Sequence, residues 1–133
     1  MNNISKWLQK RSVPVKQISE NHWLLPLEHD GAAYSLTIRE IGDWFSYGAE
    51  LMADVEGEKS DEFYRKILDL NRVLNGAHIA KEGDKLILIH NELTSHMNEE
   101  EFIKYLAIFH RSHEYVLKEI LNEGAELGVK FKT

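Results

Sequence analysis

Histidine is the residue type in this chain that is best suited to chemistry near neutral pH, because an imidazole both titrates there and binds metal ions. Among the 7 histidines, His110 and His113 stand three positions apart, beside Glu114, in a segment with helical periodicity. One helix face could therefore present both imidazoles together with a carboxylate. Metal sites use three or four protein ligands, and the spacing ties no further ligand to this pair. We interpret His110 and His113 as histidines that border an apolar helix stripe, and we predict no metal site.

Other motifs that carry catalysis are missing from the sequence. The glycines form no G-x-x-x-x-G-K phosphate loop, and the histidines form no H-E-x-x-H zinc motif. Ser46 stands in Phe-Ser-Tyr-Gly rather than in the G-x-S-x-G turn of a hydrolase nucleophile. Cysteine is absent, which excludes disulfides, thiolate metal ligands and cysteine nucleophiles. We predict no catalytic residue and no cofactor, and we keep an enzyme with a hidden site at the histidines only as the last alternative.

An aromatic cluster suggests binding in place of catalysis. Strand periodicity places Phe45 and Tyr47 on one face of a sheet and Trp44 on the other. Large aromatic side chains are common at protein interfaces, because they bury much area and keep a polar handle. The alternative is that the terminal helices cover both faces of this strand. The partner-binding residues that we predict are Trp44, Phe45, Tyr47 and Leu51.

Length and charge narrow the class of partner. A chain of 133 residues with 43% hydrophobic residues fits one domain over residues 1–133, with a frayed tail at residues 125–133. The formal net charge of −6 repels phosphate backbones, so we expect no nucleic-acid partner. The start of the chain lacks the features of a signal peptide, and no apolar run approaches the roughly 18 residues of a membrane span. We expect a cytoplasmic protein that binds another protein and no membrane.

These residues must be positioned by an α+β fold. Helical and strand periodicity alternate along the chain, and turns that contain glycine separate the segments. The expected order is helix, three strands, helix, two strands and helix, with the strands in an antiparallel sheet. The predicted segments are helix 3–11, a three-stranded meander within 15–53 with turns at 30–31 and 42–43, helix 61–75 after a break at 56–59, strands 77–80 and 85–90, and a final helix from 98 to about 124.

One helix and one strand suggest contact with a second chain. The strand at 86–89 is apolar on both faces, which indicates either the middle of a sheet or an interface between chains. The helix at 61–75 carries a single apolar stripe at helical spacing. We predict a homodimer that uses both elements, with interface residues Phe63, Ile67, Leu70, Ile87 and Ile89.

The order of elements resembles the fold of type III secretion chaperones of the CesT/Tir type and of the related YbjN-like proteins. The resemblance covers nearly the whole chain, and its most telling stretches are 63–71 (Phe-Tyr-Arg-Lys-Ile-Leu-Asp-Leu-Asn), 76–80, 83–88 and Glu92-Leu93. In those families a helix with leucines and an asparagine leads into a strand of small residues, a turn, an apolar strand and an acidic-leucine step before the last helix.

The resemblance implies two non-enzymatic functions. The first is a small acidic homodimer without cofactor that binds an extended segment of a partner protein, as a chaperone does. The second is a YbjN-like sensory transduction regulator that acts through protein contacts. An unfolded or secreted client would favour the first function, and a single folded regulator would favour the second.

Overall fold

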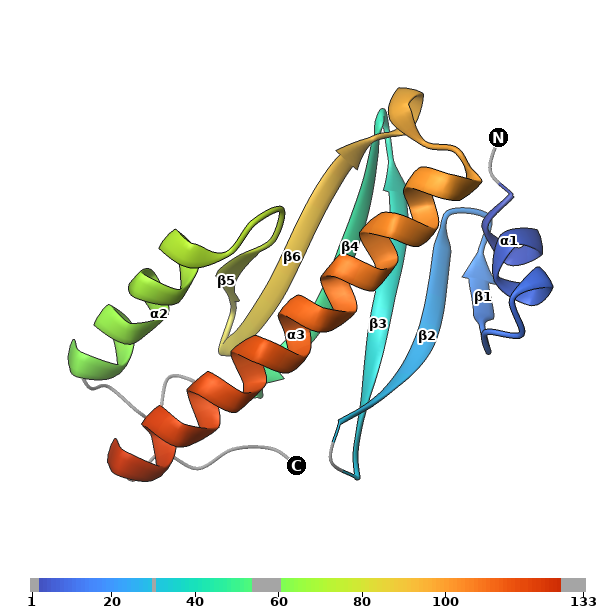
Figure 1. Ribbon diagram of the computed structural model, residues 1–133. Coiled ribbons are helices and arrows are strands. Elements are labelled where there is room, and N and C mark those ends of the chain that lie inside the picture. The colour runs from blue at the N-terminus through green and yellow to red at the C-terminus, as the bar shows by residue number, and fades with distance from the viewer. Residues whose placement is uncertain (1–2, 30, 54–60, 128–133) are drawn as a thin grey trace.

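A six-stranded antiparallel sheet with helices along one face forms the structure (Figure 1). The computed structural model describes residues 3–29, 31–53 and 61–127, and it describes the side chains of the last helix as far as Ile120. The predicted α+β class and order of elements are confirmed, and the range predicted as a three-stranded meander, 15–53, contains a fourth, short strand at its start. The described elements are α1 (Ile4–Lys10), β1 (Lys16–Ser19), β2 (His22–His29), β3 (Ala32–Ile41), β4 (Trp44–Met52), α2 (Asp61–Val73), β5 (His78–Glu82), β6 (Lys85–Leu93), a 3-10 helix (Thr94–His96) and α3 (Glu99–Leu127).

The strands lie in the order β1-β2-β3-β4-β6-β5, and each neighbouring pair is antiparallel. Gly42 adopts a positive φ of 59° in the turn between β3 and β4, which glycine does without strain. β6 pairs with β4, with Trp44 opposite Leu93 and Glu50 opposite Ile87. The strand that is apolar on both faces therefore lies inside the sheet, which is the first of its two predicted places. The predicted break at 56–59 lies outside the described residues.

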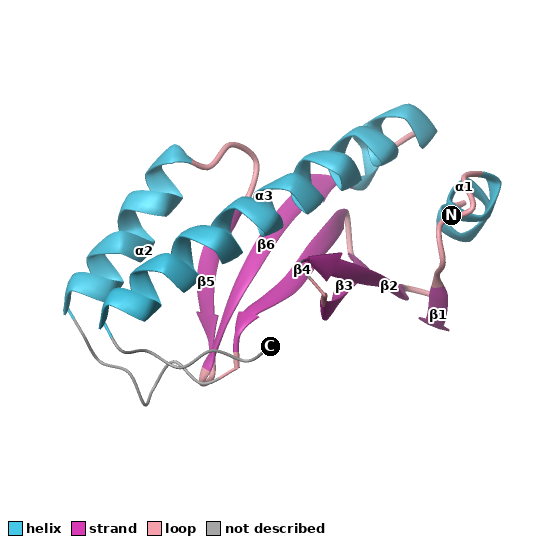
Figure 2. Cartoon of the chain, turned by 60° about the horizontal axis from the view of Figure 1, so that its bottom comes forward, coloured by secondary structure: helices cyan, strands magenta, loops and turns pink. Residues whose placement is uncertain are grey.

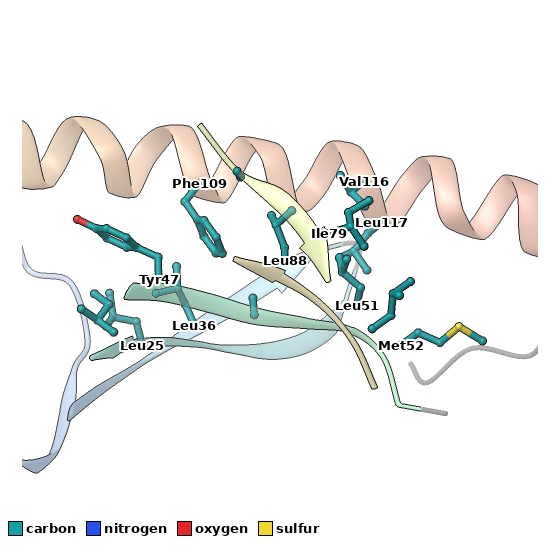
Figure 3. Close-up of a cluster of buried hydrophobic side chains, with 14 of the residues drawn as sticks. Leu25, Leu36, Tyr47, Leu51, Met52, Ile79, Leu88, Phe109, Val116 and Leu117 are labelled. Atoms are coloured by element: carbon teal, nitrogen blue, oxygen red, sulfur yellow. The ribbon is translucent and has the colours of Figure 1, made fainter. Parts of the chain in front are cut away.

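The core lies between the sheet and α3. Alternate residues of β4 point toward the helices, so Phe45 and Tyr47 are 3% and 0% exposed, whereas Trp44 is 49% exposed. In Figure 3, side chains from the strands converge on Phe109 and Val116 of α3. α2 packs on the same face of the sheet as α3 (Figure 2). The fold therefore has two layers, with one face of the sheet turned toward both long helices.

α3 begins at a side-chain cap. The Asn98 Oδ1 accepts a hydrogen bond from the Glu101 N–H at 2.9 Å, which caps the start of the helix. The 29 residues of α3 span about 43 Å, which is enough to cross the sheet. The helix continues past Gly124 to Leu127, so the predicted end at this glycine is too early. The rest of the predicted tail, residues 128–133, lies outside the described residues. No helix in the described ranges is long and apolar enough to span a membrane.

α1 docks on α3 through one aromatic contact and two ion pairs that share a carboxylate. The Trp7 ring lies 5.6 Å from the Phe102 ring. The Lys10 ammonium and the Arg11 guanidinium lie 3.2 and 3.1 Å from the Glu99 carboxylate. A helix of 7 residues is too short to persist alone, so these contacts maintain it.

The side chain of Asn71 in α2 closes part of the outer edge of β5. Its Nδ2 donates to the Ile79 carbonyl oxygen at 3.0 Å, and its Oδ1 accepts from the Ile79 N–H. One amide group thus satisfies both backbone groups of a residue that is only 6% exposed, and it ties α2 to the sheet.

Replacement of Asn71 by leucine is expected to lower the free energy of unfolding by about 1–3 kcal/mol, because it leaves two buried backbone groups without partners. Urea unfolding followed by circular dichroism measures the change. The control is Asn91→Leu in β6, which alters an exposed asparagine and should change stability by less than about 0.5 kcal/mol. Equal stability of the two variants would contradict this role of Asn71.

Candidate functional site

The face of the sheet opposite α2 and α3 is the candidate functional surface. None of the described helices covers it, as Figure 2 shows. The side chains on this face, which we call the open face, come from the strand positions that alternate with the core. Its apolar side chains include Pro26, Ile41, Trp44, Ile87, Ile89 and Leu93.

Three of these apolar side chains form a row at one end of the open face. The register places Ile41 opposite Trp44 and Trp44 opposite Leu93. Ile41 is 58% exposed and Trp44 is 49% exposed. Single exposed apolar residues are ordinary on protein surfaces, but cross-strand neighbours of this size form a patch. We call this row the Trp44 patch.

The open face is hollowed next to the Trp44 patch. The hollow is lined by small residues such as Ser46 and Gly48 and by the apolar residues Pro26, Ile87 and Ile89. The volume of the hollow is about 700 Å³. Gly48 has no side chain, so a side chain of a ligand can occupy the space above it. The hollow can therefore accept apolar side chains of another molecule.

Charges of both signs border the hollow. Arg39 lies among its lining residues, and the Lys85 ammonium lies 3.7 Å from the Glu50 carboxylate. A ligand with a strong excess of one charge gains little from such a mixed border. The surface therefore favours a ligand with mixed polar and apolar side chains.

The structure separates the four predicted partner-binding residues. Trp44 lies on the open face, as alternation predicts. Phe45, Tyr47 and Leu51 are 3%, 0% and 2% exposed beneath the helices, so they have no surface to offer a partner. The alternation predicted that Trp44 lies on the face opposite Phe45 and Tyr47, and the structure shows that the Trp44 face is the exposed one and that the other three residues belong to the core.

The predicted dimer residues also fall into two sets. Phe63, Ile67 and Leu70 are 0%, 7% and 3% exposed, because their stripe packs into the core of the same chain. Ile87 and Ile89 are half-buried on the open face. The two sets lie on opposite sides of the sheet, so they cannot form one continuous interface. Of the five predicted dimer residues, Ile87 and Ile89 are the two that reach the surface.

A buried histidine pair connects the sheet to α3. The His29 Nε2, at the end of β2, lies 3.0 Å from the His113 Nδ1. The His113 Nε2 lies 3.0 Å from the Glu50 carbonyl oxygen in β4. Sequence reasoning found His113 but missed His29, because 84 positions separate them and no spacing rule joins them. The structure therefore pairs His113 with His29 by hydrogen bonding.

The predicted neighbours His110 and Glu114 complete this group. The His110 ring stacks on the His29 ring with centroids 4.9 Å apart. The Glu114 Oε2 lies 3.5 Å from the His29 Nδ1. No set of three His, Asp or Glu side chains within the described ranges could hold a metal ion. The group therefore joins the end of β2 to α3 through a hydrogen bond, a ring stack and an ion pair.

A second histidine group lies near the start of α3. The Glu92 carboxylate lies 3.5 Å from the His90 Nε2 and 3.6 Å from the His96 Nδ1. The His90 ring stacks on the Tyr105 ring at 5.3 Å. Burial lowers the pKa of His90, and the nearby Glu92 carboxylate opposes that shift. The His90–Tyr105 contact joins β6 to α3, and the Glu92–His96 contact joins β6 to the 3-10 helix.

Comparison with known proteins finds similarity in structure. No protein-family model matches the chain, and no curated protein sequence matches it. A chain of the ExsC–ExsE complex matches with a TM-score of 0.63 and 16% identity, over 89% of this chain and 96% of that chain. YbjN from E. coli matches with a TM-score of 0.62 and 17% identity, over 92% and 90%. A chain of the heterodimeric ExoU–SpcU complex from the type III secretion system of Pseudomonas aeruginosa matches with a TM-score of 0.62 and 13% identity, over 87% and 96%.

These matches confirm the fold predicted from the sequence, which is that of YbjN-like proteins and type III secretion chaperones. At 13 to 17% identity the likeness concerns the fold. One fold can serve many functions, so the function depends on the surfaces of this chain.

Proposed function

We propose that this chain is a non-enzymatic, chaperone-like domain that binds an extended segment of another protein on the open face of its sheet. The observation that carries the proposal is that the helices in the described part of the chain cover one face of the sheet and leave the other uncovered. The open face leaves Ile41 and Trp44 about half exposed, next to a hollow of about 700 Å³. Exposed apolar side chains grouped around a hollow are typical of protein-binding surfaces.

An extended segment suits the shape of this surface. Every second side chain of an extended chain points the same way, so one set can enter the hollow above Ser46 and Gly48. The Trp44 patch can then cover an apolar residue at one end of the segment. Two of the similar structures are complexes of two different proteins, ExsC–ExsE and ExoU–SpcU, which supports a protein partner for this fold.

The proposal includes a homodimer in the cytoplasm and no catalytic site. Ile87 and Ile89 are the predicted dimer residues that remain on the surface, where they also line the hollow, so the dimer contact and the partner segment adjoin on the open face. Light scattering after size-exclusion chromatography tests the dimer. A strict monomer at tens of micromolar protein would remove it from the proposal.

Replacement of Trp44 by serine tests the binding surface. A central aromatic residue of an interface contributes about 2 kcal/mol or more, so the variant should bind the partner at least about thirty-fold more weakly. The partner is captured from native cytosol by the unaltered chain, and its affinity for each variant is then measured by titration. Trp44 is half exposed, so the variant should keep its fold.

The matched control is Tyr115→Ser, which removes an aromatic side chain that is 46% exposed on α3. This control should bind as tightly as the unaltered chain. Equal affinities of the Trp44 and Tyr115 variants would show that the open face is not the binding surface.

A YbjN-like regulatory role is the second candidate, because the YbjN structure covers 92% of this chain. Both functions would use the same open face and differ in the partner. Mass spectrometry of the captured protein separates them: unfolded or secreted clients support the chaperone-like role, and one folded regulator supports the regulatory role.

A further inference from the structure

The hydrogen bonds of His29 and His113 fix where their protons lie. The Glu50 carbonyl oxygen only accepts, so the His113 Nε2 at 3.0 Å must carry a proton. The His113 Nδ1 and the His29 Nε2, also 3.0 Å apart, have room for a single bridging proton. The neutral pair therefore has its remaining lone pair on the His29 Nδ1.

The number of protons on the two imidazoles decides whether the hydrogen bond between His29 and His113 can persist. One added proton on the His29 Nδ1 would face the Glu114 Oε2 at 3.5 Å, so the singly charged pair is paired at every ring nitrogen. A second added proton would place two hydrogens between the His29 and His113 nitrogens. Those nitrogens are only 3.0 Å apart, so the contact must break.

Two further aromatic side chains pack against the His29–His113 pair. His110 of α3 stacks on His29 at 4.9 Å. Tyr34 of β3 meets His113 edge-on at 5.1 Å. Burial raises the pKa of Tyr34, so this phenol stays neutral and adds no charge to the pair in acid.

The surroundings of His113 oppose the addition of a second proton to the His29–His113 pair. Burial, followed by the neighbouring His29 and His110, lowers the pKa of His113 to about 4, although the hydrogen bond to the Glu50 carbonyl opposes the shift. The Glu50 carboxylate itself lies 3.7 Å from the Lys85 ammonium, which offsets its charge. His113 therefore takes up its proton much more readily once it leaves this site.

We infer that the His29–His113 pair is a proton-operated latch between the sheet and α3, which holds with at most one added proton and opens when a second one binds. His113 lies between Phe109 and Val116, two core residues of α3. Opening of the latch frees this part of the helix and uncovers apolar surface on the side of the sheet opposite the open face. The latch is independent of the partner-binding role proposed above.

Hydrogen exchange of the full chain, measured by NMR from pH 7 to pH 4 and corrected for intrinsic exchange, tests the latch. The protection of the amides at 109–116 should fall about tenfold per pH unit below about pH 6.5, because the open state binds one proton more than the closed state. Their protection should stay below that of β4 and β6 and depend little on added urea, because the opening is local.

Exchange at 109–116 with the same protection and the same urea dependence as in β4 and β6 would overturn the latch. That result would mean that protons act on global unfolding alone. Protection that does not change with pH would overturn it as well.

Glu114→Gln provides a variant that spares both imidazoles, since the Glu114 side chain is 49% exposed. Removal of this carboxylate should shift the titration of His29 to lower pH, as seen in the NMR signals of the ring nitrogens. Glu100→Gln removes the same charge at the exposed start of α3 and should leave His29 unchanged. An unchanged His29 in Glu114→Gln, or a His113 without a proton on Nε2 at neutral pH, would overturn the latch.

Discussion

Replacement of Phe109 by alanine is expected to lower the free energy of unfolding by about 3–5 kcal/mol, because it leaves a cavity in the centre of the core. Phe109 is 1% exposed, and its ring lies 6.0 Å from the Tyr47 ring beneath α3. Figure 3 shows the side chain pointing from the helix into the sheet. A domain of this size has a total stability of about 5–15 kcal/mol, so the loss is a large part of the whole. Urea unfolding followed by circular dichroism measures it.

Tyr115→Ala is the matched control for this prediction. It truncates an aromatic residue on the same helix that is 46% exposed, so stability should change by less than about 1 kcal/mol. If Phe109→Ala does not fold, Phe109→Leu gives a milder test with a loss of about 1–1.5 kcal/mol. A loss in Tyr115→Ala as large as in the Phe109 variant would contradict the orientation of α3.

Local periodicity predicted the parts of the fold in which one face is buried. β4 alternates large apolar and small or polar residues, and the structure buries Phe45 and Tyr47 while it exposes Trp44. β1 was missed because all 4 of its residues are exposed, so it shows no alternation to detect. The end of α3 was placed too early because Gly124 has a low helix propensity, which tertiary packing can override.

Contacts between distant segments were the part that periodicity could not predict. The stripe of Phe63, Ile67 and Leu70 indicated burial but not the identity of the covering surface, and the covering surface belongs to the same chain. His29 carried no signal because its partner is contributed by α3, far along the sequence. The hollow in the open face likewise depends on residues from several strands.

Acid is expected to destabilise the protein, by roughly 3 kcal/mol between pH 6.5 and pH 4 through His113 alone. The pKa of His113 is lowered to about 4 in the folded chain, chiefly by burial, and returns to about 6.5 on unfolding. Between these values the unfolded state binds more protons than the folded state. The stabilisation is therefore complete above about pH 6.5 and is lost as the pH falls toward 4. Urea unfolding at a series of pH values measures this slope.

Two histidine variants separate His113 from the other titrating groups. His113→Gln keeps a donor for the Glu50 carbonyl oxygen but takes up no proton, so its stability should depend less steeply on pH than that of the unaltered chain. His96→Gln alters a side chain that is 63% exposed and should keep the original slope. Stability that stays constant or rises as the pH falls from 6.5 to 4.5 would contradict the assignment, because a buried neutral imidazole must be charged before or during acid unfolding. A slope that survives in His113→Gln would place the proton uptake on another residue.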